Sequence, residues 1–79
     1  MAKSEKRRIE ELYSKTLLSV EKIKDRVAEV ENKMGNEENT PTDLQKYAVA
    51  LNNLTKSQQV EIKTLKDLGA VLSAMEKDD

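Results

Sequence analysis

One interruption decides the fold of this chain, and it reads Gly35-Asn36-Glu37-Glu38-Asn39-Thr40-Pro41-Thr42-Asp43. Its glycine and first asparagine follow a periodic segment, and both residue types tolerate the left-handed backbone with which many helices end. Thr40 can cap free N–H groups, Pro41 suits the first position of a helix, and Asp43 occupies the acidic position of a capping box. The stretch therefore predicts a helix end, a loop over residues 35–40 and the start of a second helix.

Before the loop, from about residue 5 to 34, seam residues recur at alternating steps of four and three, which is the heptad period of a coiled coil. They are Ile9, Tyr13, Thr16, Val20, Ile23, Val27, Val30 and Met34. Leu12 and Leu17 widen this stripe at one end, enough for contact with more than one neighbouring helix.

After the loop, from about residue 41 to 75, a second seam follows the same period. It contains Leu44, Tyr47, Leu51, Leu54, Gln58, Glu61, Leu65, Leu68, Leu72 and Met75. Its polar middle allows two interpretations: local solvation or a shift of the buried face towards Ile62, which we favour, or a buried polar layer that fixes register.

These patterns predict an all-α fold, an antiparallel two-helix hairpin of coiled-coil type that forms a single domain over residues 1–79 and ends in a polar tail at 76–79. A connection this short usually makes two helices antiparallel neighbours. The predicted hairpin core consists of Val20, Ile23, Val27, Leu51, Leu54, Leu65 and Leu68.

A lone hairpin leaves apolar side chains outside its seam, although burying one Leu or Val is worth about 1.5–3 kcal/mol. Self-association into a helical bundle, most simply a dimeric four-helix bundle, or binding to a protein partner would cover them. The candidate partner or oligomer surface consists of Leu17, Val49, Ile62 and Val71.

Composition excludes several classes of function. The 79 residues include no Cys and no His, so we expect no disulfide, no Cys/His metal site and no histidine general base. The net charge of -1 argues against a dedicated nucleic-acid binder. No apolar run approaches the roughly 18–20 residues of a membrane span. We expect no catalytic residue, cofactor, metal or small-molecule substrate, and a cytoplasmic location.

A basic cluster near the N-terminus is the one candidate for contact with anions. It consists of Lys3, Lys6, Arg7 and Arg8, and such side chains could touch nucleic-acid phosphates or anionic lipid headgroups. The alternative, which we favour, is a solubilising helix end whose charge is diluted by Glu5. Binding to nucleic acid is therefore possible but not favoured.

The second helix also carries a distinctive order of apolar, aromatic and lysine residues. Pro41 is followed by Leu44, Tyr47 and Leu51, then by the stretch Ile62-Lys63-Thr64-Leu65-Lys66-Asp67-Leu68 and by Ala70-Val71-Leu72. In these features the chain resembles the needle subunits of bacterial type III secretion systems. The resemblance implies a helical hairpin that polymerises into an extracellular filament. The end of the chain departs from that family, because Met75 is followed by charged residues instead of an apolar terminus.

A second resemblance rests on the stretch Thr40-Pro41-Thr42-Asp43-Leu44. It is similar to the start of the oligomerisation hairpin in phage small terminase proteins, and it implies an oligomeric module linked to DNA packaging. Three functions are thus open: a self-associating adaptor, chaperone or small regulator of bacterial or phage origin, a structural subunit of a helical assembly, and a nucleic-acid-linked module.

Overall fold

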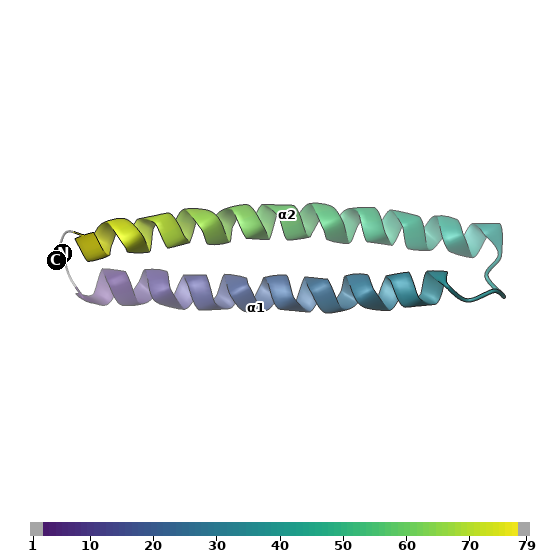
Figure 1. Cartoon of the computed structure of the whole chain (residues 1–79), viewed down its shortest axis with the longest axis horizontal. Coiled ribbons are helices and arrows are strands. Elements are labelled where there is room, and N and C mark those ends of the chain that lie inside the picture. The colour runs from purple at the N-terminus through teal and green to yellow at the C-terminus, as the bar shows by residue number, and fades with distance from the viewer. Residues whose placement is uncertain (1–2, 78–79) are drawn as a thin grey trace.

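The computed structural model describes residues 3–77 and contains two helices, α1 over Lys3–Met34 and α2 over Pro41–Lys77. The helices lie antiparallel and side by side, joined by the loop at one end (Figure 1). Together they form a rod of 59 × 14 × 14 Å, as expected from a rise of about 1.5 Å per helical residue. The predicted all-α hairpin is confirmed.

The helices extend further than the sequence pattern predicts. α1 begins at Lys3, ahead of the expected start near residue 5. α2 continues to Lys77, so Glu76 and Lys77 are helical and do not belong to the predicted polar tail. The remaining tail residues, 78–79, lie outside the described part of the chain.

The end of α1 is built differently from our expectation. No residue from 3 to 77 has a positive φ, so neither Gly35 nor Asn36 adopts the left-handed conformation that we predicted. The helix instead tightens into a turn in which the Gly35 N–H donates to the Asn32 carbonyl and the Asn36 N–H to the Lys33 carbonyl, both at 3.2 Å. The side-chain amide of Asn39 donates to the same Lys33 carbonyl at 2.6 Å. Side-chain and turn hydrogen bonds therefore satisfy carbonyls that a left-handed cap would otherwise satisfy.

The start of α2 is the predicted capping box. The Thr40 N–H donates to Oδ2 of Asp43, and the Asp43 N–H donates to Oγ1 of Thr40, each at 3.1 Å. The backbone N–H of Thr40, then its hydroxyl and the nearby Lys46 ammonium, hold the pKa of Asp43 below its usual value. This pair fixes the direction in which α2 leaves the loop.

Residues of both seams are half-buried between α1 and α2, including all seven of the predicted hairpin core. Thr16 fits in the seam because its hydroxyl donates to the Leu12 carbonyl at 2.8 Å, which leaves its methyl group free to pack. Leu44 is the exception: it is 39% exposed. The first turn of α2 extends beyond the end of α1 (Figure 1), so no turn of α1 stands opposite this leucine.

Within the described residues, no side chain is fully buried. Each seam residue has the other helix on one side and open space on its flanks, because two helices cannot surround a side chain. The fold is therefore a pair of matched stripes without an enclosed core. Neither described helix has a stretch that is long and apolar enough to cross a membrane.

The capping box generates a prediction with a defined pH dependence. Because the folded-state pKa of Asp43 lies below its unfolded value, the charged cap stabilises the fold above the ordinary Asp pKa of about 4. That stability is lost as the pH falls through the lower folded pKa. Asp43→Asn should therefore be less stable than the wild type at neutral pH, and the difference should shrink in acid. Urea unfolding at both pH values measures it.

Thr40→Ala provides the comparison for this test. It removes one capping oxygen and should lower the free energy of unfolding at neutral pH by about 0.5–2 kcal/mol. If Asp43→Asn is as stable as the wild type at neutral pH, the reciprocal bonds do not stabilise α2.

Candidate interaction surface

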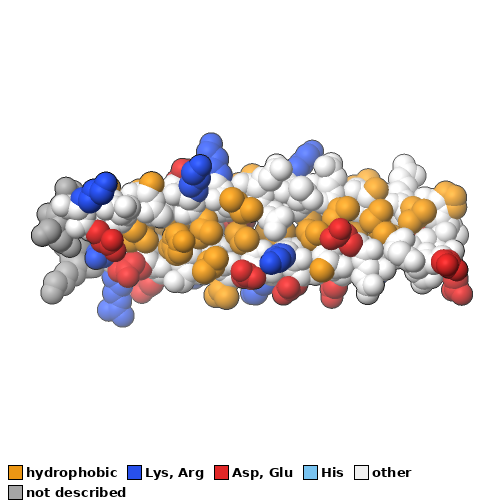
Figure 2. Space-filling model, in the orientation of Figure 1, with side chains coloured by type: hydrophobic (Ala, Val, Ile, Leu, Met, Phe, Trp, Pro, Cys, Tyr) orange, Lys and Arg blue, Asp and Glu red, His pale blue; other side chains and the backbone are white. Residues whose placement is uncertain are grey.

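The surface of the rod carries more large apolar side chains than two seams account for. Those at least 39% exposed are Leu12, Leu17, Leu18, Leu44, Val49, Val60, Ile62 and Val71. On the face shown in Figure 2, hydrophobic side chains are visible along the furrow between the helices as two stretches, separated by other side chains. The furrow is therefore open to contact from outside.

All four residues of the predicted partner surface are exposed: Leu17, Val49, Ile62 and Val71. They do not form one patch. Val71, like Leu12, stands one position before a seam residue, whereas Leu17 and Ile62 each stand one position after. In an antiparallel pair, equivalent heptad positions lie on the same flank. Leu12 and Val71 thus share one flank of the hairpin, and Leu17 and Ile62 share the opposite one.

The register of the two helices brings each of these pairs to a similar level along the rod. A Cβ built on Gly69 would lie 3.6 Å from Cε2 of Tyr13, so these two positions stand opposite each other. Counting outward from them in antiparallel helices places Val71 level with Leu12 and Ile62 within about one turn of Leu17. Each flank therefore presents an apolar pair contributed by both helices.

Two exposed apolar residues were missed by the sequence reasoning, Leu18 on α1 and Val60 on α2. Both lie on outward faces, away from the seams. They could have been found by searching the outward-facing positions of each predicted helix for apolar residues, in addition to the positions of the seam.

The polar middle of the second seam stays on the contacting face. Gln58 and Glu61 are half-buried, whereas Ile62 is 47% exposed. The predicted shift of the buried face towards Ile62 is therefore wrong. Because Gln58 and Glu61 are only half-buried, local solvation and a polar layer that fixes register both stay predictions. One heptad from the Tyr13–Gly69 position, Val20, which is itself half-buried, comes level with Ile62 and within one residue of Glu61. The seam of α1 continues here without a break, and it holds the polar residues of α2 in place.

The basic cluster is not gathered on one side of α1. Lys6, Arg7 and Arg8 are consecutive, so they spread over about 200° of the helix circumference. Lys6 is half-buried, and Nε of Arg7 lies 3.6 Å from Oε1 of Glu11. The side chain of Lys3 lies outside the described part of the chain. The described members of the cluster thus offer no continuous basic face to an anion.

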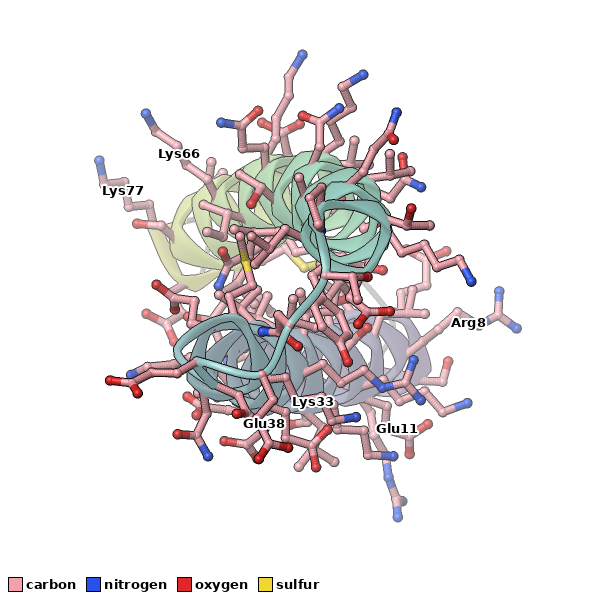
Figure 3. All side chains as sticks on the ribbon, turned by 90° about the vertical axis from the view of Figure 1, so that its right-hand side faces the viewer. Arg8, Glu11, Lys33, Glu38, Lys66 and Lys77 are labelled. Atoms are coloured by element: carbon pink, nitrogen blue, oxygen red, sulfur yellow. The ribbon has the colours of Figure 1, made fainter. Side chains whose placement is uncertain are left out.

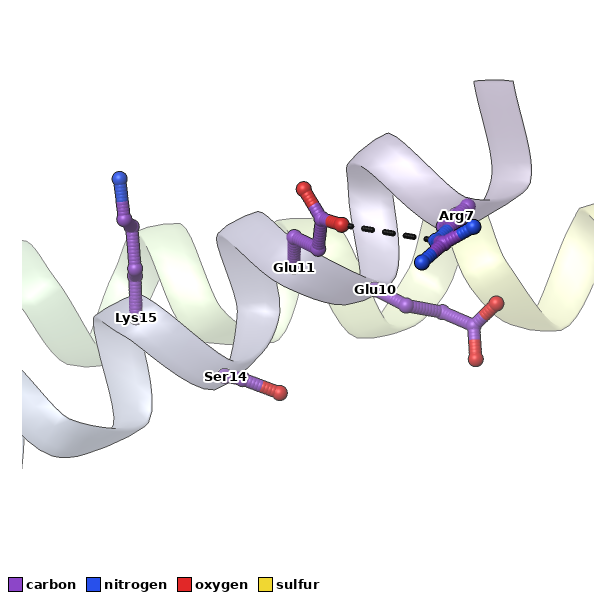
Figure 4. A pocket seen from close by; sticks show the side chains of 5 residues that line it. All are labelled: Arg7, Glu10, Glu11, Ser14 and Lys15. Carbon is purple, nitrogen blue, oxygen red and sulfur yellow. Dashed lines mark ion pairs between the residues drawn. The ribbon is translucent and has the colours of Figure 1, made fainter. Parts of the chain in front are cut away.

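Shallow hollows on the surface do not resemble a ligand site. One lies on α1 alone and is lined by Arg7, Glu10, Glu11, Ser14 and Lys15. Figure 4 shows that the carboxylates of Glu10 and Glu11 point in different directions and that Glu11 is turned to Arg7. Among residues 3–77, no three acidic side chains come together as a metal site would require.

Charge is distributed unequally between the helices. Of the 32 residues of α1, 16 are charged, but only 9 of the 37 residues of α2 are. Viewed along the rod, labelled charged side chains such as Arg8, Glu11 and Lys66 project outward, away from the contact between the helices (Figure 3). α1 is thus the more polar partner of the pair, and α2 offers more uncharged surface.

Comparison of the chain with protein-family models, with curated proteins and with solved structures finds no match.

The half-buried polar residues of α2 lead to a second prediction. Gln58→Leu should raise the free energy of unfolding by about 1 kcal/mol, because half-burial of a leucine recovers part of the 1.5–3 kcal/mol of full burial. Gln59→Leu, at an exposed neighbouring position, is the matched control and should leave it nearly unchanged. Thermal unfolding of the three chains measures the difference.

Sedimentation of the same variants tests whether the polar layer fixes register. If Gln58→Leu alters the sedimented mass, the polar layer specifies the assembly. Equal gains in stability for Gln58→Leu and Gln59→Leu would show that the contacting face is misassigned.

Proposed function

We propose that this chain acts without catalysis, through self-association and binding to a protein partner, as a cytoplasmic adaptor, chaperone or small regulator of bacterial or phage origin. One observation carries the proposal. Residues 4–77 contain no fully buried side chain, while eight large apolar residues are 39–67% exposed. Covering these apolar side chains with another helix or protein removes them from water and so stabilises the molecule.

The size of that gain supports association as the main activity. Full burial of one Leu, Ile or Val is worth about 1.5–3 kcal/mol, and small domains have a net stability of only a few kcal/mol. Covering even three or four of these side chains is therefore comparable with the stability of the whole hairpin. Folding and association of this chain are expected to be coupled.

A structural subunit of a helical assembly is a second candidate, and the needle of type III secretion systems, which the sequence resembles, is one example. The flanks favour it: Leu12 with Val71 on one side and Leu17 with Ile62 on the other form two separate apolar pairs. Two different surfaces on opposite sides of one chain allow head-to-tail contacts that do not close.

An oligomeric module linked to nucleic acid is the weakest of the three proposals. Arg7 is paired with Glu11, and Lys6 and Arg8 point to different sides of the same helix. If DNA binding at low salt is absent, this proposal can be dropped.

Sedimentation across a concentration series, from micromolar to millimolar, distinguishes these functions. We expect species larger than the 9.0 kDa monomer, with the mass levelling at a fixed small oligomer. Growth without a limit would support the filament instead. A monomer at every concentration would contradict the proposal of self-association.

Charged substitutions identify the surface responsible. Ile62→Lys should reduce the sedimented mass, because it places a charge in an apolar contact. Gln59→Lys introduces the same charge on the same helix outside the apolar set, so it should sediment as the wild type does. If both variants behave alike, the flank that contains Ile62 is not an interface.

A further inference from the structure

The contact between the helices is divided near its middle by polar side chains. Gln58 and Glu61 are half-buried on the contacting face of α2. In the antiparallel register they stand opposite Ile23 and Val20, to within one residue. The two stretches of hydrophobic side chains in Figure 2 are likewise separated near the middle of the rod. The contact therefore consists of two apolar segments joined by a polar one.

The two apolar segments lie at opposite ends of the rod. The loop half covers residues 27–54, and its seam consists of Val27, Val30, Met34, Tyr47, Leu51 and Leu54. The free half covers residues 3–16 and 65–77, and its apolar seam residues are Ile9, Tyr13, Leu65, Leu68, Leu72 and Met75. At the free half, the start of α1 lies beside the end of α2 (Figure 1).

The loop half is tied together and the free half is not. The loop over residues 35–40 joins the helices at one end, and the side chain of Asn39 and the Thr40–Asp43 capping box fix its geometry. Helix ends joined by so short a connection stay close when their contacts break, so they pair again at a low entropic cost. At the other end the chain does not connect the helices, and separation there is easier.

Two residues weaken the free half further. Gly69 is the one glycine within the described helices, and glycine in a helix interior is less stable than alanine because its backbone loses more freedom on folding. A Cβ at Gly69 would lie 3.6 Å from Cε2 of Tyr13, an ordinary van der Waals distance, so the packing does not require glycine. Lys6 is half-buried three residues before Ile9, hence at a seam position from which its ammonium group must extend to reach water.

We propose that the hairpin opens in two stages, in which the free half separates first while the loop half stays paired. The polar middle is the boundary, because Gln58 and Glu61 lose little when water reaches them, whereas apolar side chains at these positions would oppose the opening. The open state exposes seam residues such as Tyr13, Leu68 and Leu72, which the closed rod half-covers. This opening is a property of the single chain and goes beyond the proposed function.

Hydrogen exchange of the backbone amides under native conditions, resolved by residue with NMR, tests the two stages. Amides of residues 9–16 and 65–72 should be less protected, by roughly tenfold or more, than amides of residues 27–34 and 47–54. Low concentrations of urea should accelerate exchange more steeply in the loop half, because complete unfolding exposes more surface than partial opening. One level of protection and one urea dependence for both halves would overturn the proposal.

Ala48→Gly distinguishes two-stage opening from opening as one unit. Ala48 is exposed and stands three heptads before Gly69, at the same position of the repeat. The substitution weakens the loop half alone, so exchange there should become roughly fivefold faster. Amides of the free half should keep their wild-type rates, because they exchange while the loop half is still paired. Equal acceleration in both halves would show that the hairpin opens as one unit.

Gly69→Ala is the converse variant and keeps the test valid if Ala48→Gly does not fold. The added methyl group fits against Tyr13, so exchange in the free half should become roughly fivefold slower. Unchanged exchange in the free half would show that Gly69 lies outside the segment that opens, and the proposed division would be wrong.

Gln58→Leu tests the boundary itself. It makes the polar middle more apolar, so the difference in protection between the halves should shrink. Gln59→Leu, at the exposed neighbouring position, should leave that difference as it is in the wild type. If Gln58→Leu also leaves the difference unchanged, the polar middle is not the boundary and the proposal fails.

Discussion

Two helices in contact can bury only one stripe of each, and this geometric limit governs the rest of the structure. The seam residues are half-buried and no described side chain is enclosed, because a third and a fourth helix are needed to close the space around a seam. Hydrophobic stabilisation scales with the area removed from water. The hairpin therefore obtains only part of the hydrophobic stabilisation that its apolar residues can provide. The rest could be obtained only by association.

The loop fixes the register in which the two helices face each other. Turn and side-chain bonds end α1, and the reciprocal bonds of Thr40 and Asp43 start α2. With both ends fixed, Tyr13 stands opposite Gly69, and apolar residues beside the seam are sorted onto opposite flanks. On the outer face of α2, Val49 and Val60 remain exposed as well. Local capping thus determines which apolar side chains remain exposed.

The hairpin itself could be predicted from the sequence because its signals are local and periodic: a 3.5-residue repeat, a glycine stop and a capping box before Leu44. What could not be predicted depends on the opposite helix. Ile62 appeared to be a better seam residue than Glu61, but the unbroken seam of α1 at Val20 keeps Glu61 on the contacting face. Leu44 fits the heptad, yet α1 ends before reaching it. Val60 was overlooked because it belongs to no seam and lies on the outer face of α2.

The central claim is that this fold is completed by association, and thermal unfolding at different protein concentrations tests it most directly. A second copy that binds only the folded chain raises the unfolding midpoint by mass action as the protein concentration rises. We predict a midpoint that increases steadily from micromolar to millimolar protein. A midpoint that stays constant over this range would contradict the account, since it would show that the hairpin is stable with its apolar flanks exposed.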